Sequence, residues 1–373
     1  MKKLLRLLAT VAFVALLSGG YLVVDRWRKN PEQIVPYPYD FQAPSPAMKP
    51  DAPILIVGDR MGEYFGRFKE ELAAAISQNL DNVIKTQSIA AEGLGLHRTL
   101  HQLRSLSQWP QIVIYQGGSE EFAEEKFLPS ETRKIAANFR LYQDDRIHTF
   151  LILYPWLSRL VYAPMERAHL GAVPKIDREL SEKEYLQRLQ TELLLYEEQL
   201  GDLVSMARDR NSLLILTTTP INLDVAPKKV CSFASNTEID KALEDLRKKS
   251  GAGDWKGAWK EASRLSLLYS GNAELYYLKG MIGKNLSKGQ EAVNSMLEAS
   301  SYDCAAWRAT ELQNSIIRKV ARAQKVILFD FSRMVEKDWI NSTTFLDELR
   351  PQNIYYDKAM NQLGSAIRKI LKL

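Results

Sequence analysis

Polar residues with the potential for chemistry follow several predicted strands of this chain, at the points where the strands end. Ligands of a doubly wound parallel sheet bind at the carboxyl ends of its strands, so the turns there are the candidate sites. Four turns stand out: Gly58-Asp59-Arg60, Gly93, Gly117-Gly118-Ser119-Glu120, and Asp347-Glu348-Leu349-Arg350. Carboxylates, a hydroxyl and two guanidinium groups would meet at one edge of the sheet.

The order and spacing of these turns resemble the SGNH/GDSL hydrolase superfamily. In that family a Gly-Asp-Ser turn carries the nucleophile, a glycine and an asparagine from the next two turns complete the oxyanion hole, and a late Asp-x-x-His supplies the base. Residues 115–120 and 303–309 also resemble a subgroup with a tetratricopeptide-like insertion. The resemblance covers about residues 53–227 and 300–373. It implies a three-layer, flavodoxin-like α/β fold with a parallel sheet.

The positions that react in the family are not kept here. Asp59, Gly93 and Asp347 match, whereas Arg60 replaces the serine, Ser119 the asparagine and Arg350 the histidine. An alkoxide nucleophile needs a hydroxyl near a base with a pKa close to neutral, and a guanidinium group stays protonated in proteins. The resemblance therefore implies a degenerate site with no catalytic residue.

The same resemblance brings the two arginines of this degenerate site close together. Two like charges need compensation, and Asp59, Glu120 and Asp347 are the nearest acidic residues by motif position. We expect a salt-bridge network there. The alternative is that one arginine is left free to receive a carboxylate or phosphate group.

Other residues give weaker signals for chemistry. His97 and His101 lie four apart on a predicted helix, but no third ligand has a suitable spacing, so neither a metal nor a cofactor is expected. Ser119 as a displaced nucleophile would lack the second glycine of a nucleophile elbow. Glu120 and Glu121 could bind a cation, although solvated loop acids are the simpler interpretation.

Alternating strands and helices must position these turns. Apolar runs and helical periodicity predict strands at 54–57, 82–89, 112–115, 213–217 and 326–331, and helices at 64–79, 94–106, 181–210, 310–324 and 355–373. The predicted core comprises Ile54, Leu55, Ile56, Val57, Ile112, Val113, Ile114, Leu214, Ile215, Leu216, Ile327 and Leu328. Residues 147–165, interrupted by Pro155, are either a strand or a broken helix. We expect a core element there, with a partner or membrane-surface patch as the alternative.

Between the two parts of the α/β domain, 53–227 and 301–373, the pattern is helical. In residues 228–300, Ala258 and Ala262 are matched 34 residues later by Ala292 and Met296, and 34 is the tetratricopeptide period. We expect an inserted helical unit that leans on the main domain. A plain helical hairpin is the alternative.

The first 29 residues contain the longest apolar run of the chain. Residues 7–24 carry no charge and follow three basic residues, which predicts a single-pass inner-membrane anchor with the rest in the periplasm. A cleaved signal peptide is the alternative. Residues 30–52 contain six prolines, which indicates a linker. Residues 1–29 hold six Lys/Arg and one Asp, so the remainder is neutral and no nucleic-acid partner is expected.

Two cysteines, Cys231 and Cys304, flank the predicted insertion. In an oxidising compartment they could form a disulfide that clamps both ends of the insertion to the sheet domain. Two free buried thiols are the alternative.

Together these features predict a non-catalytic, membrane-anchored scaffold or recognition module with a protein partner in an envelope complex. A glycan or an anionic ligand could occupy the degenerate cleft. The alternatives are an esterase or O-acyltransferase acting on envelope glycans, and a carbohydrate-binding protein.

Overall fold

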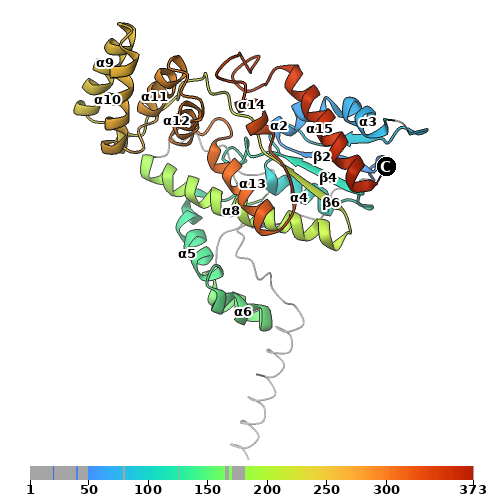
Figure 1. Ribbon diagram of the computed structural model, residues 1–373. Helices are drawn as coiled ribbons and strands as arrows, with labels where there is room; N and C mark the ends of the chain where they lie inside the picture. The colour runs from blue at the N-terminus through green and yellow to red at the C-terminus, as the bar shows by residue number, and fades with distance from the viewer. Residues whose placement is uncertain are drawn as a thin grey trace, which may run out of the picture. The chain divides into compact units, whose positions relative to one another are not determined.

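The computed structural model describes residues 20, 39–40, 49–78, 80–124, 126–163, 168–169 and 181–372 (Figure 1). Contacts divide the chain into two compact units. The helical unit comprises Met1–Asp40 and Lys126–Val173, and the sheet unit comprises Phe41–Glu125 and Pro174–Leu373. Residues 126–173, which the sequence pattern does not separate from the sheet domain, thus belong to another unit.

A five-stranded parallel sheet forms the centre of the sheet unit, in the order β3-β2-β4-β6-β7. The strands are β2 (Ile54–Gly58), β3 (Thr86–Ser88), β4 (Ile112–Gln116), β6 (Leu213–Thr217) and β7 (Ile327–Phe329). The register aligns Gly58 with Gln116 and Gln116 with Thr217, so the turns after β2, β4 and β6 begin at the same edge. The predicted α/β class with a parallel sheet is confirmed.

Helices cover both faces of this sheet (Figure 1). One face packs against α4 (Leu96–Arg104), α8 (Glu182–Asp209) and α13 (Glu311–Ala323). The other packs against α2 (Arg60–Gly66), α3 (Lys69–Ser77), α14 (Phe331–Glu336) and α15 (Asn353–Leu371). Side chains of a strand alternate between the faces, so Val113 and Tyr115 lie in one core cluster and Ile112 and Ile114 in the other. The central strands are apolar up to their last residues, Gly58, Gln116 and Thr217, because both of their faces are buried.

Three predicted details are wrong. The expected helix 64–79 is two helices, because Asp59 caps a helix that already starts at Arg60 and a break at residues 67–68 separates it from α3. The expected strand 82–89 forms only as the short β3 at one edge. At the other edge Ile327 is half-buried and Leu328 is exposed, since β7 has a neighbour on one side only. The other ten predicted core residues are buried.

Four helices follow β6 and precede α13: α9 (Thr237–Gly251), α10 (Trp255–Leu268), α11 (Ala273–Asn285) and α12 (Gln290–Ser301). A core of their own includes Leu243, Ala258, Ala262 and Ile282. A second cluster joins Ala292 and Met296 of α12 to residues of the sheet domain, among them Leu223 and Trp339. The helical segment therefore leans on the sheet domain through α12 (Figure 1).

The helical unit contains α5 (Thr132–Tyr142), α6 (Asp145–Leu153) and α7 (Ser158–Val161), with 3-10 turns at Pro129–Glu131 and Pro155–Leu157. Pro155 begins the second of these turns, so residues 147–161 are a broken helix. The expectation of a core element holds for Leu151 and Tyr162, which are buried. It is wrong for the exposed large apolar side chains of this stretch, which are Phe150, Ile152, Leu153, Tyr154 and Leu160. The short strand β1 (Tyr39–Asp40) pairs in parallel with β5 (Ala168–His169).

Where the structure describes the chain, no helix combines the length and apolar character that a membrane span requires. The predicted anchor, residues 7–24, lies outside the described residues except for Gly20. Most of the predicted linker, residues 30–52, also lies outside them.

Candidate functional site

Asp59 joins the turn after β2 to the turn after β4. Its Oδ1 accepts a hydrogen bond from the Met61 backbone N–H at 2.8 Å, which caps α2. Its Oδ2 accepts from the Ser119 N–H at 2.6 Å, the Ser119 hydroxyl at 2.7 Å and the Glu120 N–H at 3.1 Å. The Ser119 hydroxyl is therefore engaged with a carboxylate that also holds three backbone donors.

The protonation of Asp59 reflects two opposing effects. Asp59 is 1% exposed. Burial raises the pKa of Asp59 to about 6, because removal from water penalises the charged form more than the hydrogen bonds from Ser119 and Met61 favour it. The nearby Glu121 carboxylate raises it further. Asp59 can therefore change its charge in mildly acidic solution.

Arg60 is the first residue of α2 and pairs with two carboxylates. Its Nη2 lies 2.5 Å from Glu92 Oε1 and 3.1 Å from Glu120 Oε1. The Glu120 side chain is 10% exposed, whereas that of Glu92 is 64% exposed. Burial raises the pKa of Glu120, and the positive charge of Arg60 opposes this shift. The guanidinium group thus bridges one buried acid and one solvated acid.

Two glycines shape the backbone around this cluster. Gly58 has a φ of +138°, and a Cβ there would lie 1.7 Å from the Gln116 carbonyl oxygen, so only glycine fits beside β4. Gly93 has a φ of +79° and directly follows Glu92. The left-handed turn at Gly93 occurs in the loop that presents Glu92 to Arg60.

Asp347 and Arg350 lie in one loop and pair with each other. Asp347 Oδ1 accepts from the backbone N–H groups of Leu349 and Arg350 at 2.9 and 2.7 Å, and its Oδ2 lies 2.6 Å from Arg350 Nε. Partial burial acts to raise the pKa of Asp347, but these donors outweigh it and lower the pKa. The Arg350 guanidinium lies 5.6 Å from the centre of the Tyr64 ring on α2.

The structure thus links some of the expected site residues through hydrogen bonds and ion pairs, and gives others different partners. Arg60, Glu120, Asp59 and Ser119 form one cluster. Among the described residues, Arg350 forms an ion pair with Asp347, which is not one of the two carboxylates that pair with Arg60. Asp59, expected as a partner of arginine, binds N–H and O–H groups instead. Glu92 was not predicted, because an acid before a loop glycine carries no distinguishing pattern.

A small cavity, lined by both polar and apolar residues, lies beside Ser119. Gly118, Tyr185 and Arg308 also line it, and it leaves about 20 Å³ to a sphere of the size of water. That volume holds about one water molecule. Arg308 donates to the carbonyl oxygens of Asn222 at 2.7 Å and Val225 at 3.3 Å, and burial lowers the pKa of Arg308 to about 10. This cavity is too small for an acyl or sugar group.

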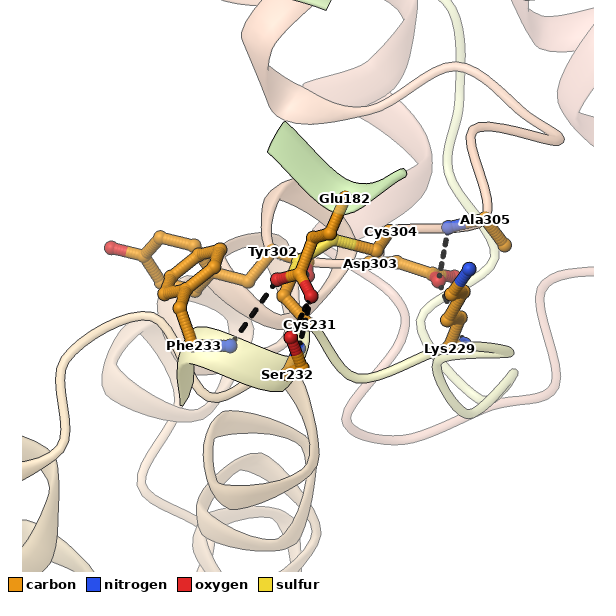
Figure 2. The surroundings of a disulfide bond; sticks show 9 residues. All are labelled: Glu182, Lys229, Cys231, Ser232, Phe233, Tyr302, Asp303, Cys304 and Ala305. Atoms are coloured by element: carbon orange, nitrogen blue, oxygen red, sulfur yellow. Dashed lines mark hydrogen bonds between the residues drawn. A yellow bond between two sulfur atoms is a disulfide. The ribbon is translucent and has the colours of Figure 1, made fainter. Parts of the chain in front are cut away.

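The disulfide between Cys231 and Cys304 ties the two ends of the helical segment together, with a Cα–Cα distance of 5.6 Å. Figure 2 shows that Glu182 and Asp303 both lie beside it. Glu182, at the start of α8, accepts hydrogen bonds from the backbone N–H and the hydroxyl of Ser232. The junction thus connects three segments that are distant in the sequence.

Asp303 is the polar centre of this junction and is 6% exposed. Its carboxylate accepts from four donors, all at 3.0 to 3.1 Å: the N–H groups of Lys228, Lys229 and Ala305, and the indole Nε1 of Trp307. In the structure, the hydrogen bonds of Asp303 in the motif 303–309 therefore stabilise a loop.

A metal site is not supported by the described residues. Glu182, Cys231 and Cys304 are the one group of potential ligands found there, and the disulfide removes both thiolates. His97 is buried and His101 is half-buried on α4, and burial lowers the pKa of His101. Glu121 accepts from the Leu96 N–H at 2.8 Å at the start of α4, so it serves as a helix cap.

Comparison with known proteins gives little beyond this geometry. No protein-family model matches the chain, and no curated protein matches it. Among solved structures, the chain is similar to a crystal structure described as a "putative acylhydrolase" from Bacteroides fragilis, with 12% sequence identity and a TM-score of 0.37. The match covers 88% of this chain and 91% of that one.

Proposed function

We propose that the chain is a non-catalytic, membrane-anchored SGNH-hydrolase-like protein that acts as a scaffold or recognition module in an extracytoplasmic envelope complex. The observation that carries the proposal is the pairing of Arg60. The residue at the position of the family's nucleophile is a guanidinium group held by Glu92 and Glu120. The residue at the position of the family's base, Arg350, is held by Asp347. Neither group can accept a proton from a hydroxyl.

Binding of a protein partner is supported by the helical segment. Leu267 and Leu268 at the end of α10 are 86% and 62% exposed, and Phe233 in the 3-10 turn at Ser232–Ala234 is also exposed. The Asn272 side chain joins the loop after α10 to this turn through a hydrogen bond to the Ala234 carbonyl at 2.7 Å. Large exposed apolar side chains on neighbouring segments favour a contact with another protein. The disulfide and the Asp303 carboxylate hold the ends of this segment, which suits a rigid recognition surface.

Affinity purification of the full chain through a C-terminal tag, from native membranes, tests this role. We expect a protein partner in comparable amount that is lost with a Leu267→Ser/Leu268→Ser variant. Val83→Ser provides the control, because Val83 is 71% exposed on a different part of the sheet unit. Recovery of the same partner with the Leu267→Ser/Leu268→Ser variant would contradict a role for α10. If the wild-type chain recovers no partner, the scaffold role itself is contradicted.

Anchorage and orientation rest on residues 7–24 and on the basic residues before them. A C-terminal alkaline phosphatase fusion should be active, and a fluorescent reporter that folds only in the cytoplasm should be dark. The opposite pattern would refute the orientation.

A second candidate function, ester hydrolysis or acyl transfer through Ser119, is favoured by one contact. The Ser119 hydroxyl lies 2.7 Å from Asp59, a carboxylate whose pKa burial raises to about 6. Against this function, the cavity that adjoins Ser119 holds about one water molecule and leaves no space for an acyl group. A fluorophosphonate probe decides between the two. The proposed function expects no labelling, whereas labelling that Ser119→Ala abolishes would establish the enzyme.

A further inference from the structure

The helical unit presents an unusual run of exposed apolar side chains. Leu153 and Leu160 are 67% and 66% exposed, and Phe150, Ile152 and Tyr154 are each more than 40% exposed. The five lie within eleven residues, on α6, on α7 and at the turn between them. Large apolar side chains gathered in this way mark a surface that meets something other than water.

The same segment is basic. Residues 132–161 hold five Lys/Arg and two Asp/Glu, a net charge of +3, although residues 30–373 as a whole are neutral. Arg133, Lys134, Arg140 and Arg146 are exposed. On α6, Arg146, Phe150 and Leu153 are spaced by four and then three residues, so they share one side of the helix. Basic residues next to aromatic and aliphatic ones are typical of helices that lie in the interface of an anionic bilayer.

The path of the chain keeps this segment near the predicted anchor. The apolar run ends at residue 24, and fifteen residues later β1 pairs with β5. Fifteen residues span at most about 50 Å. The strand β5 begins seven residues after α7 ends, which adds at most about 25 Å. The exposed segment is therefore tied by short stretches of chain to residues 7–24.

We propose that α6, the turn Pro155–Leu157 and α7 form a second membrane contact, which lies on the surface of the bilayer that holds the anchor and binds anionic lipid headgroups. The proposal rests on the proposed membrane anchorage and adds a site to it. The exposed Phe150, Leu153 and Leu160 would enter the headgroup boundary by about 5–10 Å, with the arginines toward the phosphates. Such a contact would fix the orientation of the helical unit on the membrane.

A position-specific fluorescent label tests this contact in the full chain. Both native cysteines form the disulfide, so an introduced cysteine is the only reactive thiol. Leu153→Cys, labelled with an environment-sensitive dye, is reconstituted in vesicles of phosphatidylcholine alone or with phosphatidylglycerol. Val83→Cys, labelled in the same way, is the matched exposed control. Quenching by nitroxide-bearing lipids is compared with quenching by aqueous iodide, and flotation measures anchorage independently.

We expect lipid nitroxides to quench the label at residue 153 at least about twofold more than the label at residue 83, with a larger effect in anionic vesicles. Arg140→Glu/Arg146→Glu should reduce this quenching while flotation is unchanged. Equal quenching by iodide at residues 153 and 83 would overturn the proposal. Protection of residue 153 from both iodide and lipid nitroxides would also overturn it, because it would indicate a second copy of the chain on this surface. If the chain does not float with the vesicles, the anchor itself is refuted. Flotation without quenching at residue 153 would refute only the second membrane contact.

Discussion

Two buried carboxylates, Asp59 and Asp303, each hold loops together through several N–H donors, yet their surroundings differ. Asp303 lies beside a disulfide, and the four groups that donate hydrogen bonds to its carboxylate are all neutral. Asp59 lies beside a charged cluster in which Arg60 bridges Glu120 and the solvated Glu92. The first region is built to keep one geometry. The second places a partly exposed guanidinium group between a buried and a solvated carboxylate, so one of its ion pairs is open to water.

The largest effect should come from the disulfide. The cysteines are 73 residues apart, and closing a loop of that length stabilises the folded chain by roughly 4 kcal/mol in the chain-entropy description. We expect Cys231→Ser/Cys304→Ser to lower the free energy of unfolding by about that amount, measured with denaturant in detergent. Reduction of the wild type should have the same effect. A loss below about 1 kcal/mol would show that hydrogen bonds alone hold the junction.

The pH dependence of stability should identify Asp59. Its folded pKa of about 6 lies above the ordinary value of 3.8, so the stability that it contributes is complete below about pH 4 and is lost as the pH rises through 6. The change is about 3 kcal/mol for two pKa units. Asp59→Asn cannot titrate, so the destabilisation that it causes should be larger at pH 4.5 than at pH 7. The reverse order would mean that the N–H donors keep Asp59 ionised.

Asp303 should contribute to the free energy of unfolding at neutral pH. Asp303→Asn places an amide N–H₂ against donors that now face a carboxylate, and we expect a loss of about 2 kcal/mol in unfolding free energy. Asp245→Asn, on the exposed side of α9, is the control and should change little. Similar small effects for both variants would contradict the structural role given to Asp303.

Arg60 should have the smallest effect. Its side chain is 28% exposed and one of its partners is largely solvated, so Arg60→Ala should cost at most about 1 kcal/mol. Arg350→Ala, which breaks a more exposed pair, should cost no more. A loss of several kcal/mol for Arg60→Ala would place Arg60 with Asp303 as a structural centre, and the contrast between the two regions would be lost.

The central sheet was predictable from the sequence because β2, β4 and β6 are short apolar runs that both layers of helices bury. Edge elements were less predictable, since β3 and β7 carry weaker or half-exposed patterns. Residues 147–161 misled the prediction for a physical reason. Aromatic and aliphatic residues that face a membrane or a partner have the same composition as residues that face a core.

Within the candidate site, turn position alone located Asp59, Arg60, Ser119 and Glu120, because parallel strands deliver their following residues to one edge. Glu92 could not be found in this way, since its role depends on how a loop at Gly93 folds back. The donors around Asp303 are mostly backbone N–H groups, which have no signature in a sequence.

Hydrolysis by the full chain in detergent tests the central claim most directly. Turnover of p-nitrophenyl acetate is measured for the wild type beside Arg60→Ala and Ser119→Ala, at pH 7 and with a buffer blank. The account predicts the same background rate for all three proteins, because the cavity beside the Ser119 hydroxyl has room for about one water molecule and not for an acyl group. Turnover clearly above buffer that disappears in either variant would contradict it.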